Sequence, residues 1–100
     1  MGNGYKILWT DHALNELEST FEYLETNFTE RELINLSEEI ENVTYLISQN
    51  PKLFQESDYK KDVRKAVVMK FNSMYYRIIN NTIEILSFFS NRQNPDKIKL

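Results

Sequence analysis

The sequence has no cysteine, two glycines, two prolines and one histidine among its 100 residues. Without cysteine it has no disulfide and no cysteine-ligated metal site. Both glycines lie within the first four residues, which excludes a glycine-rich phosphate-binding loop. The motifs HExxH, GxSxG and CxxC are missing, and His12 is expected to be a surface residue at the start of a helix. We therefore expect no metal and no cofactor.

Long apolar runs are also missing. The N-terminal stretch MGNGYKILWTDHAL has the pattern of neither a signal peptide nor a membrane span, so we expect a cytoplasmic protein without a membrane partner. With 41% hydrophobic and 13% aromatic residues, the composition is globular. The length fits one domain, residues 1–100, which is large enough to bury its own core.

Charge is distributed unevenly between the two halves of the chain. Residues 1–50 contain ten acidic residues and two cations, whereas residues 51–100 contain ten cations and five acidic residues. Such asymmetry indicates a basic surface for a polyanion or a charged protein partner. It is equally typical of a solvated acidic helix face opposite a mildly basic sheet, and the net charge of −3 leaves both interpretations open.

Two amphipathic helices are predicted in the first half. A short strand at residues 5–9 precedes Thr10, whose side chain is a suitable helix N-cap. Thr29-Glu30-Arg31-Glu32 is a capping box that begins a second helix, and Asn50-Pro51 ends it. Because the connection is so short, an antiparallel hairpin is expected. The apolar positions at helical spacing are Ala13, Leu14, Leu17, Phe21, Leu24 and Phe28, then Leu33, Leu36, Ile40, Val43 and Ile47.

The last third of the chain is predicted to form a β-meander with strands Val63–Phe71, Met74–Ile79 and Thr82–Phe89. The turns are expected at Asn72-Ser73 and Asn80-Asn81, because asparagine tolerates the left-handed backbone of tight turns. The last strand is apolar on both faces and should be central, beside the N-terminal strand. This gives the strand order 2-3-4-1, and counting a reversal at each connection makes the first and last strands antiparallel.

Together these elements predict an α+β fold of order β-α-α-β-β-β. A helical hairpin would pack on one face of a four-stranded, mostly antiparallel sheet. The other face would be open, partly polar and partly aromatic, and would carry the function. Tyr75 and Arg77 should share one side of their strand, while Tyr76 points to the other side, toward the hairpin.

Cations in and around the meander are the candidate functional residues. Arg64, Arg77 and Arg92 could converge on the open face, where a guanidinium group can clamp phosphate and an aromatic ring can stack on a base. The simpler interpretation is that these cations keep a sheet edge soluble. The cluster comprises Lys60, Lys61, Arg64, Lys65, Lys70, Arg77 and Arg92.

Several features together resemble the RelE/ParE superfamily of bacterial toxins. A strand ending in Trp-Thr precedes an Ala/Leu helix, a second helix closes on Asn-Pro, and an arginine opens the next strand. Tyr75-Tyr76-Arg77-Ile78 occupies the middle strand, and Arg92-Gln93-Asn94-Pro95 follows the last. The resemblance spans most of the chain and implies the same β-α-α-β-β-β fold. It further implies a toxin of a type II toxin–antitoxin system, a class linked to growth inhibition and plasmid stabilisation.

The resemblance leaves two activities open. RelE-like members cut messenger RNA on the ribosome, and Lys61, Arg64, Arg77 and Arg92 would then be the catalytic candidates. However, the stretch NRQNPDKIKL has no tyrosine or histidine, and Ser90 stands where many relatives have a histidine, so a general acid or base is not evident. ParE-like members poison DNA gyrase by binding, and we favour this function.

For a ParE-like toxin the expected target-binding residues are Arg64, Lys70, Tyr75, Arg77 and Arg92. The implied partner is a cognate antitoxin, a short protein with a DNA-binding N-terminal part. The implied target is DNA gyrase or, in the RelE-like alternative, ribosome-bound messenger RNA. A third alternative is an inactive toxin-like domain that serves only as a binding protein.

Overall fold

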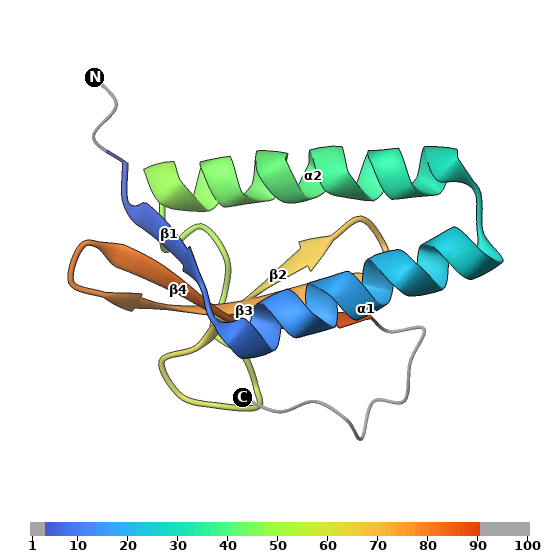
Figure 1. The fold of residues 1–100 in the computed structure, drawn as a ribbon. Coiled ribbons are helices and arrows are strands. Elements are labelled where there is room, and N and C mark those ends of the chain that lie inside the picture. The colour runs from blue at the N-terminus through green and yellow to red at the C-terminus, as the bar shows by residue number, and fades with distance from the viewer. Residues whose placement is uncertain (1–3, 91–100) are drawn as a thin grey trace.

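The computed structural model describes residues 4–90, which form two layers (Figure 1). One layer is a four-stranded sheet of β1 (Lys6–Trp9), β2 (Arg64–Val68), β3 (Asn72–Ile79) and β4 (Thr82–Ser90). The other layer is a hairpin of two helices, α1 (Asp11–Asn27) and α2 (Glu30–Gln49), which lie side by side on one side of the sheet. The predicted α+β fold of order β-α-α-β-β-β is confirmed.

Local signals define where both helices begin and end. The Thr10 hydroxyl accepts a hydrogen bond from the Ala13 amide at 3.1 Å, and the Thr29 hydroxyl accepts one from the Glu32 amide at 3.3 Å. Asn50 closes α2, because its amide donates to the Leu46 carbonyl while its own backbone has already left the helical region. The three boundaries predicted from Thr10, Thr29 and Asn50-Pro51 are therefore confirmed.

The strand order is β1-β4-β3-β2, as predicted, but the direction of β1 is not. β1 runs parallel to β4, with Lys6 opposite Thr82 and Trp9 opposite Ile85. The prediction of an antiparallel pair was wrong because it assumed a reversal between β1 and α1. Thr10 alone connects these two elements, and α1 continues alongside the second half of β4 instead of turning back.

The two turns of the meander differ from each other. The β3–β4 turn lies at Asn80-Asn81 as predicted, with Asn80 at a φ of 54°. The β2–β3 turn lies at residues 69–71, one step before the predicted Asn72-Ser73. Asn72 pairs with Val68 in the sheet, and its side-chain amide donates to the Val68 carbonyl at 3.2 Å, so this asparagine closes the turn from within the strand.

The main core fills the space between helices and sheet. α2 contributes four buried side chains at helical spacing, whereas α1 contributes Ala13 and Leu24, with Leu17 and Phe21 partly buried. Leu14 and Phe28, both predicted for the apolar face of α1, are 46% and 38% exposed. The sheet supplies the remaining buried residues, namely Ala66, Val68, Met74, Tyr76, Ile83, Ile85 and Phe88.

A second, smaller cluster lies on the face of the sheet that turns away from the helices. It consists of Val63, Tyr75 and Phe89, with Leu86 packed against it. The loop at residues 51–63 runs along β2, where the Lys65 amide donates to the Gln55 carbonyl at 3.0 Å. The face predicted to be open is therefore partly covered, and only its remaining area is available to a partner.

Candidate functional site

Arg64 does not stand on the open face. It lies opposite Tyr76 in the β2–β3 pairing, and Tyr76 belongs to the main core, so both side chains point to the helical side. One guanidinium nitrogen of Arg64 donates to the Phe54 carbonyl at 2.6 Å. Arg64 thus fastens the 51–63 loop to β2, and the predicted convergence of Arg64 with Arg77 is wrong.

Tyr75 points away from the helices as predicted, but it is buried. Its ring is 1% exposed and meets the ring of Tyr59 edge-on, with 6.0 Å between the centroids. Burial raises the pKa of the Tyr75 hydroxyl, and the neighbouring Tyr59 adds to the effect. In this structure Tyr75 supports the covering loop, and its face is not available for stacking on a base.

Arg77 is the predicted residue that does stand on the open face. Its Nε donates to a carboxylate oxygen of Glu84 at 2.6 Å, directly across the β3–β4 pairing. Leu8 lies next to Glu84 on β1 and is 53% exposed. Leu8, Glu84 and Arg77 therefore form one row across three strands, which we call the open-face row.

The other predicted residues lie apart from this row. Lys70 is exposed in the β2–β3 turn, where its Nζ lies 5.7 Å from the centre of the Phe71 ring. Lys61 is exposed near the end of the 51–63 loop. Arg92 lies outside the described residues. The structure therefore does not gather Lys61, Arg64, Lys70 and Arg77 into one cluster.

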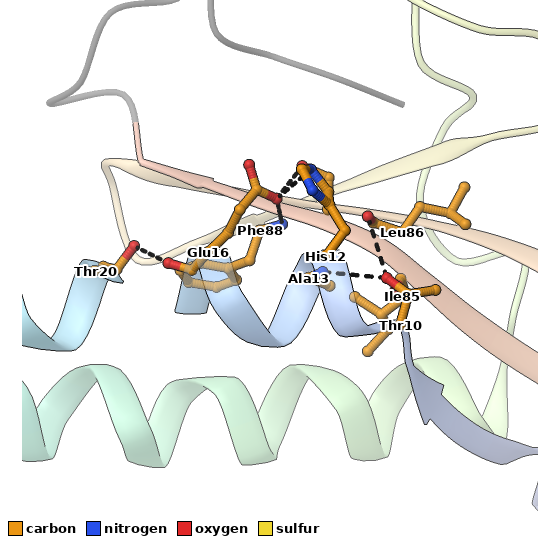
Figure 2. A network of polar contacts seen from close by, with 9 residues as sticks. Thr10, His12, Ala13, Glu16, Thr20, Ile85, Leu86 and Phe88 are labelled. Carbon is orange, nitrogen blue, oxygen red and sulfur yellow. Dashed lines mark hydrogen bonds and ion pairs between the residues drawn. The ribbon is translucent and has the colours of Figure 1, made fainter. Parts of the chain in front are cut away.

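Two residues that could transfer protons, Tyr76 and His12, have partners within the fold. The Tyr76 hydroxyl donates to the Pro51 carbonyl at 2.7 Å inside the molecule, and burial raises its pKa. His12 lies on α1, with its Nε2 3.3 Å from a Glu16 carboxylate oxygen (Figure 2). Within residues 4–90 no group of three or more His, Asp or Glu could hold a metal ion.

The sequence patterns missed Glu16, which connects α1 to β4. A carboxylate oxygen of Glu16 accepts hydrogen bonds from the Ser87 hydroxyl at 2.6 Å and the Phe88 amide at 2.9 Å (Figure 2). The Thr10 hydroxyl donates to the Ile85 carbonyl at 3.0 Å in the same network. Spacing did not distinguish Glu16 from the other glutamates of α1. The available indication was that the predicted last strand, residues 82–89, is longer than the predicted first strand, residues 5–9, so part of its edge needed another partner.

No helix of the described chain combines the length and the apolar character needed to cross a bilayer.

Comparison with known proteins shows the fold. No protein-family model and no curated protein matches the sequence. Among solved structures, a chain of the chromosomal ParDE toxin–antitoxin system from P. aeruginosa matches with a TM-score of 0.74 at 14% identity, over 89% of this chain and 98% of that chain. A copper-bound mutant toxin from Helicobacter pylori matches with a TM-score of 0.53 at 12% identity, over 88% and 96%. The chain therefore has a RelE/ParE-like toxin fold.

Proposed function

We propose that this chain is the toxin of a toxin–antitoxin module and that it arrests bacterial growth by binding DNA gyrase, as ParE-like toxins do. The fold shared with the ParDE structure supports the toxin assignment. The proposed partner is a cognate antitoxin, a short protein with a DNA-binding N-terminal part.

The observation that favours binding over RNA cleavage is the dispersal of the catalytic candidates. Arg64 is engaged by the Phe54 carbonyl, and Arg77 is engaged by Glu84. RNA cleavage needs a proton acceptor and cationic groups assembled around one phosphate. Among the described residues, these groups point in different directions.

The open-face row also fits a protein target better than a polyanion. Glu84 lies 2.6 Å from Arg77 and neutralises its charge, whereas the phosphates of RNA attract unpaired cations. Leu8, which is 53% exposed and lies next to Glu84 on β1, and Ile79, which is 41% exposed on the strand of Arg77, place apolar surface beside this ion pair. Apolar anchors beside paired charges are typical of protein–protein contacts.

The proposal is tested in two assays, one with the purified chain and DNA gyrase and one by expression in a bacterial host. We expect inhibition of gyrase-catalysed DNA supercoiling, together with accumulation of cleaved DNA held by gyrase. We expect no new 5′ ends on translated messages after brief expression in a bacterial host. Cuts in register with codons would replace this proposal with the RelE-like activity. If neither gyrase inhibition nor messenger cleavage is seen, a binding protein without toxicity is favoured.

A matched pair of substitutions tests the surface. We expect Leu8→Glu to weaken gyrase inhibition at least roughly tenfold, the loss typical of an anchor residue. Leu14→Glu introduces the same charge at a leucine of similar exposure, 46% against 53%, but on α1. It should keep full activity, and both variants should melt like the parent. Equal loss of inhibition in both variants would show that the open-face row is not the target surface.

A further inference from the structure

A pocket of about 430 Å³ lies between the closed end of the helical hairpin and the β2–β3 turn. Its apolar lining includes Leu24 and Leu36, whose side chains also belong to the main core. It opens on the side of the sheet that carries the helices, so it is separate from the open-face row. We call it the turn pocket; its lining residues used below are Leu24, Arg31, Leu36, Met69, Lys70 and Phe71.

The β2–β3 turn holds large apolar side chains at the rim of this pocket. Met69 is 44% exposed and Phe71 is 39% exposed, although the turn has only three residues. Met69 adopts a φ of 59°, a left-handed conformation that disfavours side chains other than those of glycine, asparagine and aspartate. The other turn of the meander uses Asn80 for the same conformation. Methionine at this position therefore costs stability and increases exposed apolar surface, a combination found at functional sites.

Two cations from different elements stand at the same rim. Arg31 is the only lysine or arginine between residues 11 and 49, and the structure places it on this pocket. Lys70 comes from the turn itself, with its Nζ over the Phe71 ring. Glu32 is the one acidic side chain in the lining, so cations outnumber anions there, in contrast to the strongly acidic hairpin around them.

We propose that the turn pocket is a docking site for an acidic peptide segment of a partner protein. One large apolar side chain of that segment would enter between Met69 and Phe71, above Leu24 and Leu36. Its carboxylates would pair with Arg31 and Lys70. Charge complementarity selects this occupant, because a basic segment would bring its cations against Arg31 and Lys70. The inference goes beyond the toxin function and does not depend on it.

The test uses the full chain and a fluorescein-labelled synthetic octapeptide that carries glutamates around a central Leu-Phe. We expect saturable binding by fluorescence anisotropy, and at least tenfold weaker binding to the double variant R31E/K70E. The control variant K52E/K60E makes the same change in net charge at two other exposed lysines and should bind like the parent. Amide shifts in ¹⁵N spectra should map to residues 29–36 and 69–72.

A second variant separates docking from folding. Met69→Asn removes the apolar side chain but suits the left-handed backbone, so it should fold at least as well as the parent and bind the peptide several-fold more weakly. Equal weakening by both charge variants would reduce the effect to general electrostatics and overturn the proposal. Absence of binding, shifts confined to the open-face row, or shifts at residues 69–72 on raising the protein concentration alone would also overturn it.

Discussion

Two residues, Met69 and Asn80, adopt the same left-handed backbone in the two turns of the meander. Their φ values are 59° and 54°. Asparagine tolerates this region because its short polar side chain bonds locally, whereas for an unbranched apolar residue the region costs about 1–2 kcal/mol. Met69 therefore lowers the stability of the protein relative to a residue that tolerates this backbone conformation.

Exchanging the residue types at these turns should change stability in opposite directions. We expect Met69→Asn to raise the free energy of unfolding by about 0.5–1 kcal/mol, because it relieves backbone strain at an exposed site. Asn80→Met should lower it by about 1 kcal/mol for the converse reason. Urea denaturation of both variants measures the effect. If both change stability in the same direction, turn strain is not what separates them.

Burial of Tyr76 makes stability depend on alkaline pH. Burial raises its pKa above the ordinary value of 10.0, against partial opposition from Arg64 and the Phe54 backbone. The folded protein thus holds this proton more tightly than the unfolded chain, so the stabilising contribution is complete below about pH 10 and is lost as pH rises through the folded pKa.

We therefore expect the melting temperature to fall above about pH 10, and to fall less steeply in Tyr76→Phe. That variant should be about 1 kcal/mol less stable at neutral pH, because the bond to the Pro51 carbonyl is lost. Tyr45→Phe, at a 63% exposed position, controls for removal of a hydroxyl. Parallel alkaline slopes for parent and Tyr76→Phe would contradict the assignment to Tyr76.

At the scale of elements, the edge of β4 is shared between a strand and a helix. β1 pairs with Thr82–Ile85, and the first turns of α1 continue along the remainder. There the Glu16 carboxylate accepts a hydrogen bond from the Phe88 amide, a donor that would otherwise pair with a carbonyl of a neighbouring strand. A side chain thus substitutes for a backbone partner and fixes α1 to the sheet.

Removing this carboxylate should be costly. We expect Glu16→Ala to lower the free energy of unfolding by about 1–3 kcal/mol, since the fully buried Ser87 hydroxyl and the Phe88 amide lose their acceptor. Glu18→Ala, two positions later on α1 and exposed, should change it by less than about 0.5 kcal/mol. Chemical denaturation compares the two, and equal effects would assign the loss to helix propensity instead.

Most elements could be predicted from the sequence because their signals are local. Thr10 and Thr29 cap their helices through residues three positions away, and Asn80 sets its turn by its own conformation. The direction of β1 could not be predicted, because it depends on whether a single residue, Thr10, reverses the chain. The β2–β3 turn lies earlier than predicted because Asn72 belongs to β3, from which its side-chain amide donates to the Val68 carbonyl.

At the scale of the whole molecule, the main core joins the two layers, and among the apolar residues of α2 those that face this core should lose the most stability on truncation. Leu36 is 1% exposed, whereas Ile34, two positions earlier on α2, is 44% exposed. We expect Leu36→Ala to lower the free energy of unfolding by about 2–4 kcal/mol and Ile34→Ala by less than about 1 kcal/mol. Thermal or urea unfolding measures both. Similar losses would place Ile34, too, in a buried interface.

The candidate site was harder to predict than the fold. Period-two alternation correctly put Tyr75 and Arg77 on one side, but it does not relate the faces of separate strands, and Arg64 proved to share a side with Tyr76. Nor could alternation predict that residues 51–63 would cover Tyr75, because that contact depends on a loop without periodicity. Local patterns define faces, and tertiary packing decides which of them remain accessible.

The pairing of β1 with β4 has a consequence for synthesis of the chain. The Thr10 hydroxyl donates to the carbonyl of Ile85, which lies 75 residues later. β1 therefore cannot pair with β4 until β4 has been translated. Until then the helical hairpin lacks its sheet, and the surfaces on β1, β3 and β4 are not assembled. The proposed target surface, which spans β1, β3 and β4, therefore forms only after β4 has been synthesised.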